Sequence, residues 1–208
     1  MEIKTLSRFN KETRSFNTLL LINIVGSALA MSFGVVLGAN AILTMINGGS
    51  ILLPQTAIAG LAVIGFIFAL RWLVLSAQIF DSFDDIRDEF NSLSEKADSE
   101  GLTGLIVKNM AFYRDNKSII AKLKLGCRIT GIFFLFLGAV LALSFLNMGS
   151  IQLLNLLTGT SGTALCITIG IVGLYSPSFF ERYITTWDTR LTYSAEAEKG
   201  LSRILEGK

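Results

Sequence analysis

The chain has 208 residues, of which 51% are hydrophobic and 16% charged, and its mean hydropathy is +0.58. These values lie outside the range of an ordinary soluble domain and predict an integral membrane protein. The net charge of +2 is too small to indicate nucleic acid as a partner, and the absence of histidine removes the commonest general base and metal ligand.

The first predicted element is an amphipathic N-terminal helix that leads into a membrane span. Four basic residues lie within positions 1–14, and no charged residue follows until position 71. A spanning helix needs about 20 apolar residues, so this stretch can hold two spans and a tight turn. We place the first hairpin at about 18–46 and 52–80. A basic start before an apolar run is also typical of a signal peptide, but this run continues to Ile46, too far for a signal core.

Small residues recur at every fourth position of the first predicted span. In lipid, such a stripe lets two helix backbones approach closely, and this approach drives helix association. The stripe predicts either packing within the chain or a contact between copies of it. Its residues are Gly26, Ala30, Gly34 and Gly38.

The predicted turn after the first span contains Asn47, Gly49 and Ser50. Glycine and asparagine tolerate the left-handed conformation that ends a helix, and serine caps the next helix by accepting a backbone N–H bond. An alternative is that these polar groups line the entrance of an ion path.

The second predicted span continues into a cytoplasmic helix that reaches about residue 99. Its apolar residues recur at spacings of four and three, which is the pattern of a coiled-coil seam. We expect Gly101 to end this helix. The seam residues are Ile79, Phe83, Ile86, Phe90 and Leu93.

Four aspartates share one polar face of the same helix, at Asp81, Asp84, Asp85 and Asp88. Carboxylate oxygens suit Ca²⁺ and Mg²⁺, so these residues are weak metal candidates. The alternative, which we favour, is a solvated face paired with nearby basic residues, because the sequence has no calcium-loop glycine pattern.

The second half of the chain repeats the first at an offset of 100 residues. Positions 14–88 match positions 114–188 at 16 of 75 places, and ten of these identities lie between 33 and 53. We therefore divide the chain into repeat 1 at 1–100 and repeat 2 at 101–208. Repeat 2 should contain a returning cytoplasmic helix, spans at about 119–147 and 151–177, and a C-terminal cytoplasmic helix. Its predicted turn and packing residues are Asn147, Gly149, Ser150, Gly138, Gly162 and Gly170.

Charge predicts the orientation. All 18 Lys and Arg fall within 1–14, 71–128 and 181–208, and the two predicted turns have none. Basic segments stay on the cytoplasmic side, so both termini should be cytoplasmic in the cell membrane. The hairpins are then parallel repeats, which argues against an alternating-access transporter built from inverted repeats.

Few polar groups lie in the spans. No carboxylate lies there, which argues against an ion-coupled pump. Asn23, Asn40 and Gln78 are expected to form hydrogen bonds between helices, and Cys127 and Cys166 to be packed free thiols. No nucleophile–base pair, phosphate loop or zinc motif occurs, so we predict a protein that is not an enzyme and has no cofactor or metal.

The sequence therefore predicts an all-α membrane protein with four transmembrane helices, arranged as two parallel tandem hairpin repeats with cytoplasmic extensions. The expected function is structural: an oligomer or an accessory subunit of a membrane complex, whose partners are lipid and copies of itself or other membrane subunits. The alternative is an oligomeric ion channel lined by Asn40, Asn47 and the acidic face.

Overall fold

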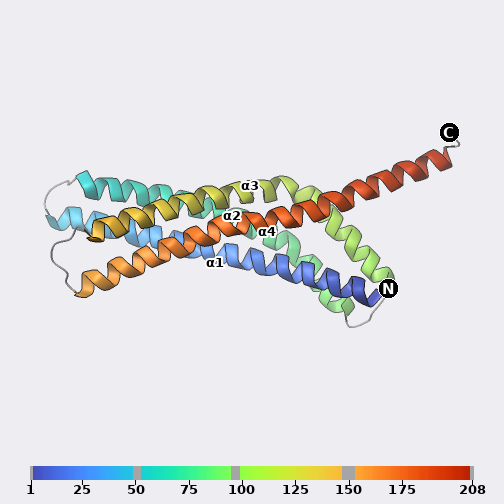
Figure 1. Ribbon diagram of the computed structural model, residues 1–208, viewed down its shortest axis with the longest axis horizontal. Coiled ribbons are helices and arrows are strands. Elements are labelled where there is room, and N and C mark those ends of the chain that lie inside the picture. Colours follow the sequence, from blue (N-terminus) through green and yellow to red (C-terminus); the bar gives the residue numbers. More distant parts are fainter. Residues whose placement is uncertain (1, 49–52, 95–98, 147–152, 207–208) are drawn as a thin grey trace.

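A computed structural model describes residues 2–48, 53–94, 99–146 and 153–206, and these are helical throughout except at Glu206. The four helices form one elongated bundle (Figure 1). Each helix is long and apolar enough to cross a membrane, so the predicted all-helical class with four candidate spans is confirmed. The helices are α1 (Glu2–Gly48), α2 (Leu53–Ser94), α3 (Ser99–Leu146) and α4 (Leu153–Leu205).

Every helix is about twice as long as a bilayer requires. The helices contain 47, 42, 48 and 53 residues, against about 20 for a span. The predicted N-terminal amphipathic helix and first span are therefore one continuous helix. The break before α3 also differs from expectation: α2 ends at Ser94, and Gly101 lies in the first turn of α3. A glycine costs little in a first turn, where the backbone N–H groups have no partner in the helix.

The helices pack mainly as two pairs, α1 with α2 and α3 with α4, while α2–α3 and α1–α4 contacts join the pairs. Figure 1 shows the end of α1 and the start of α2 at the same end of the bundle as the end of α3 and the start of α4. At the other end, α1 starts beside the end of α2 and the start of α3, while the end of α4 extends away.

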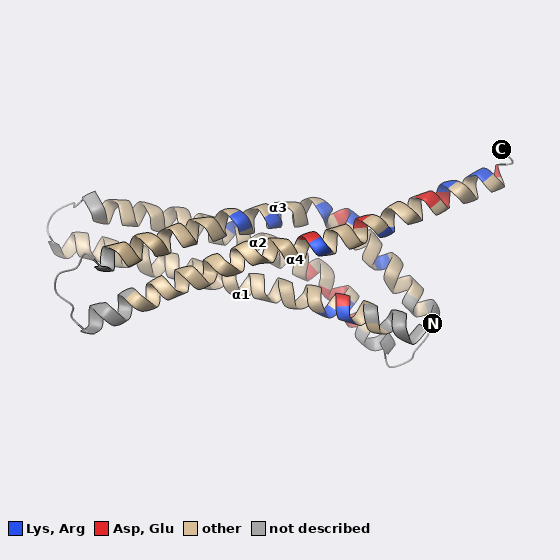
Figure 2. Cartoon of the chain, viewed as in Figure 1, with Lys and Arg blue, Asp and Glu red and all other residues tan. Residues whose placement is uncertain are grey.

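Charge and aromatic packing share one end of the bundle. Figure 2 shows Lys, Arg, Asp and Glu gathered in the half that contains the two termini. In that half, the ring of Phe16 stacks on Tyr183 with centroids 3.9 Å apart and meets Phe83 edge-on at 5.0 Å. The uncharged half exposes many large apolar side chains, as expected for surface in contact with lipid.

Candidate functional site

A buried polar cluster joins three helices near the middle of the bundle. Asn23 of α1 donates from Nδ2 to the carbonyl of Leu19 at 2.7 Å. Its Oδ1 accepts from Trp72 Nε1 of α2 at 3.0 Å and from the Cys127 thiol of α3 at 3.2 Å. Asn23, Trp72 and Cys127, the Asn23 cluster, are completely buried. Because one amide oxygen serves donors from two helices, the cluster sets the register of α1 against α2 and α3.

The expected interhelical bonds form at Asn23, whereas among the described residues neither of the other two amides has one. The side chains of Asn40 and Gln78 are exposed on the bundle surface. Cys127 and Cys166 are buried free thiols, as predicted.

Backbones of α3 and α4 approach each other very closely at two glycines. A Cβ atom added to Gly173 would lie 2.7 Å from the Cα atom of Gly131 and 2.9 Å from the carbonyl oxygen of Cys127. A Cβ atom on Gly170 would lie 2.6 Å from Leu135 Cγ. Only glycine fits where backbone opposes backbone at this distance, so these residues determine how α3 and α4 cross.

Sequence reasoning singled out Gly170 but missed Gly131 and Gly173. It searched for small residues four apart, whereas Gly170 and Gly173 are three apart. The three-residue spacing of a helix face indicates Gly173 once Gly170 is known. Gly131 is recognised only from its position opposite Gly173 in the structure.

The predicted stripe of α1 lies inside the bundle. Ala30 is fully buried, and a Cβ atom on Gly26 would meet the Trp72 ring at 3.2 Å. One on Gly34 would lie 3.4 Å from Phe66, and one on Gly38 would lie 3.5 Å from Ala62 Cβ.

The predicted packing glycines of repeat 2 face other helices as well. A Cβ atom on Gly138 would lie 3.1 Å from Cys166 Cβ, and one on Gly162 would lie 3.5 Å from the Phe33 ring. The small residues therefore lie between helices of one chain.

No family model, curated protein or solved structure matches this chain. We therefore infer function from its own residues and their geometry.

The predicted cytoplasmic seam faces the interior of the bundle. Phe90 packs on Phe9 with ring centroids 5.6 Å apart, and Phe83 packs on Phe112 at 5.4 Å. The seam therefore joins α2 to α1 and α3 of the same chain. Its buried members are Ile79, Phe83, Ile86 and Phe90, while the side chain of Leu93 lies outside the described part.

Polar contacts attach α4 to α3 at the charged end. Asp188 accepts from the Tyr113 hydroxyl at 3.0 Å and pairs with Lys117 at 2.6 Å. The hydrogen bond from Lys117 lowers the pKa of Asp188, which lies beyond the uncharged segment 129–180. The Tyr183 hydroxyl donates to Asn109 Oδ1 at 3.2 Å.

One ion pair links the two ends of the chain. Both Glu12 carboxylate oxygens accept from Arg190 Nη2, at 3.1 and 2.9 Å, and the Arg190 guanidinium lies 4.4 Å from the centre of the Trp187 ring. Beyond Arg190, α4 has no such contact within the described residues.

The aspartates of α2 do not converge on a metal position. Asp84 pairs with Arg87 at 2.6 Å and Asp88 pairs with it at 3.3 Å, while Asp81 and Asp85 are exposed. Among the described residues, no three acidic or thiol side chains are placed to hold a metal ion.

Of the predicted turn residues, only Asn47 lies in the described part, exposed in the last turn of α1. Gly49, Ser50, Asn147, Gly149 and Ser150 lie outside it.

Proposed function

We propose that the protein is a structural or interaction protein of the cell membrane, acting as an oligomer or as an accessory subunit of a membrane complex. In this proposal the membrane-spanning bundle holds the last part of α4 in a fixed position, with both termini in the cytoplasm. The observation that carries the proposal is the exposed last part of α4.

The end of α4 has no cover from its own chain. Every side chain from 192 to 206 is exposed, and Leu201, Ile204 and Leu205 expose 59%, 78% and 84% of their surface. These three lie on one face, since they are three and four residues apart. Most of the stability of a helix in a protein comes from the packing of its amphipathic face, and this segment packs on no described part of its own chain. A partner that covers this apolar face would stabilise it, and a second copy or another subunit can do so.

The packed interior supports a structural role over conduction through one chain. The Asn23 cluster and the Gly131–Gly173 crossing fill the space between the helices, and residues 15–70 and 129–180 contain no charge. A water-filled path needs polar lining at membrane depth.

Two glycines support the tandem repeat. Gly38 and Gly138 are one hundred residues apart, and each faces the second helix of its hairpin. The residues that they face, Ala62 and Cys166, do not correspond at this offset. Small buried residues also occur at this offset: Ser27 corresponds to Cys127, and Ser76 corresponds to Ser176. Both hairpins would then use equivalent positions for packing.

The oligomer is tested by measuring the mass of the detergent-solubilised protein. We expect a multiple of 22.6 kDa, or a stable complex with another membrane protein when it is taken from native membrane. Truncation after Leu191 should reduce the assembly, whereas the double change Glu196→Gln and Lys199→Gln, which alters the same segment on the side opposite its apolar face, should not. A monomer in both preparations would contradict the proposal.

Orientation is tested by labelling single cysteines in a background that lacks Cys127 and Cys166. An outside-only reagent should label cysteines placed at Ser50 and Ser150 but not those at Ser92 and Ser202. Labelling at Ser92 in intact cells would contradict the cytoplasmic placement.

The exposed Asn40 favours the channel as a second candidate, because an amide on the outer surface of a span can line a path that forms between copies. Reconstitution in planar bilayers tests this. Single-channel currents altered by Asn40→Leu, or by neutralising Asp84 and Asp85, would favour the channel over the structural role.

A further inference from the structure

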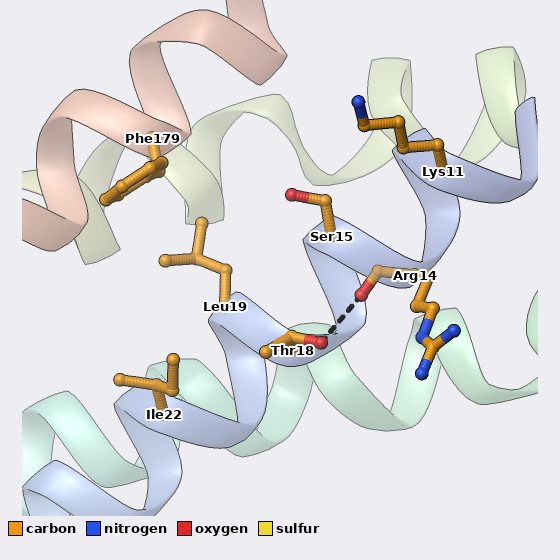
Figure 3. Close-up of a pocket in the computed structure, with 7 residues that line it drawn as sticks. All are labelled: Lys11, Arg14, Ser15, Thr18, Leu19, Ile22 and Phe179. Atoms are coloured by element: carbon orange, nitrogen blue, oxygen red, sulfur yellow. Dashed lines mark hydrogen bonds between the residues drawn. The ribbon is translucent and has the colours of Figure 1, made fainter. Parts of the chain in front are cut away.

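A surface groove lies where α1 passes α4, in the charged half of the bundle (Figure 3). It encloses about 360 Å³. Along α1 its lining changes from two cations to two hydroxyls to two aliphatic side chains, and an aromatic ring of α4 lies opposite. None of the described residues that line it carries a carboxylate. The lining residues are Lys11, Arg14, Ser15, Thr18, Leu19, Ile22 and Phe179.

The two cations of the groove are available to a ligand. Lys11 and Arg14 are exposed, and neither forms an ion pair with a described residue. Glu12, which lies between them in sequence, instead pairs with Arg190. In Figure 3 the side chains of Lys11 and Arg14 extend to different sides of α1, so positive charge flanks the groove. The Thr18 hydroxyl donates to the Arg14 carbonyl at 2.9 Å, whereas Ser15 is exposed.

The uncharged surface extends farther toward the charged end on α1 than on its neighbours. Asn23 is hydrogen-bonded to Trp72 of α2 and Cys127 of α3, so these three residues lie at the same height along the bundle. On α2 and α3 a charged residue is directly adjacent in the sequence, at Arg71 and Arg128. On α1 the next charged residue from Asn23 is Arg14, nine residues or roughly 13 Å along the helix.

This extension leaves an apolar strip without cover from the chain. Ile22 exposes 46% of its surface, and Phe179 on α4 exposes 56%. An apolar strip that ends in two cations complements an anionic phospholipid, whose acyl chain is apolar and whose headgroup is negative.

We propose that this groove binds one anionic phospholipid. Lys11 and the Ser15 hydroxyl hold the headgroup phosphate, since an ammonium group donates charge-assisted hydrogen bonds to phosphate oxygens. Arg14, on the other side of α1, adds positive charge that attracts the anionic headgroup. One acyl chain lies between Leu19 and Phe179. Basic pockets beside membrane helices bind anionic headgroups by this chemistry. The site requires that the chain lie in a membrane, but it is independent of the proposed partner of α4.

The corresponding face of α3 provides a built-in control. One hundred residues after Lys11 and Ser15, the chain has Ala111 and Asp115. There Arg114 already pairs with Asp115, at 3.3 Å. A carboxylate takes the place that the phosphate would occupy on α1, so this face should not retain an anionic lipid.

Native mass spectrometry of the detergent-purified full chain, mixed with equal amounts of phosphatidylglycerol and phosphatidylcholine, tests the site. We expect the chain to retain phosphatidylglycerol preferentially. The double change Lys11→Gln and Arg14→Gln should lower this retention by about tenfold. The matched change Arg114→Gln and Lys122→Gln removes the same charge from exposed positions of α3 and should have little effect. Phe179→Ala should lower retention without changing the charge.

Three results would overturn the site: equal losses in the two double variants, equal retention of both lipids by the unmodified chain, or displacement of the lipid by millimolar inorganic phosphate, which would indicate a site for free anions only. Circular dichroism establishes that each variant is folded. If the first double variant is not folded, the variant Ser15→Asp replaces it in the test. This change places a carboxylate beside Arg14, as Asp115 lies beside Arg114, and should abolish lipid retention. Full retention by this variant would also overturn the site.

Discussion

The α1–α2 and α3–α4 pairs differ in what opposes their glycines. At Gly34, an added Cβ atom would lie 3.4 Å from Phe66 and from the Ala62 carbonyl oxygen, which is ordinary contact. At Gly173, it would lie 2.7 Å from the Gly131 backbone. Position 34 therefore permits alanine, and position 173 requires glycine. A small-residue stripe predicts close packing, but the atoms on the facing helix decide how much space is left.

The largest effect is expected from Gly173→Ala. The new methyl group would collide with backbone atoms that no side-chain rotation can move, so α3 and α4 must separate. Overpacking of this kind costs about 1–3 kcal/mol, and a backbone collision should reach the upper end. Thermal unfolding of the detergent-solubilised protein measures it. The control is Gly126→Ala, where nothing lies within 4 Å of the added atom and helix propensity favours alanine by up to about 1 kcal/mol. Equal effects would contradict the assigned crossing.

The next largest effect is expected from Asn23→Leu. The change leaves the Trp72 indole N–H buried without an acceptor, which should cost about 1–2 kcal/mol. Leucine is close to asparagine in size and is apolar, so the change mainly removes the hydrogen bonds of the buried amide. Combining Asn23→Leu with Trp72→Phe should cost less than the sum of the two single changes, in the same unfolding assay. Strict additivity would argue against the bond.

A smaller effect is expected at Gly34. Gly34→Ala should change the free energy of unfolding by less than about 0.5 kcal/mol, whereas Gly34→Leu should push α2 away and cost about 1 kcal/mol or more. If both changes were silent, Gly34 would face lipid and not α2.

The smallest effect is the difference between Gly138→Ala and Gly38→Ala. The new atom would lie 3.1 Å from Cys166 Cβ in the first case and 3.5 Å from Ala62 Cβ in the second. We expect Gly138→Ala to be the more destabilising by a few tenths of a kcal/mol, which unfolding of both variants in parallel can resolve. The reverse order would show that the second hairpin is not the tighter one.

The sequence by itself determined the class of the protein and the buried faces of its helices. Two long uncharged stretches predict four spans, because charge is costly in hydrocarbon. The spacing of Ile79, Phe83, Ile86 and Phe90 places them on one face, and the structure buries all four. Both inferences follow from the local geometry of a single helix, which the order of residues specifies.

Only the tertiary structure decided which faces meet and at what distance. The hydrogen-bonded partners Asn23 and Trp72 are 49 positions apart in the sequence, and the paired residues Lys117 and Asp188 are 71 positions apart. Gly131 opposes Gly173 because of the rotation and shift of α3 against α4, which many side chains along both helices set together. For the same reason the groove at Lys11 and Phe179 could not be predicted: its walls belong to opposite ends of the chain, and only packing brings them together.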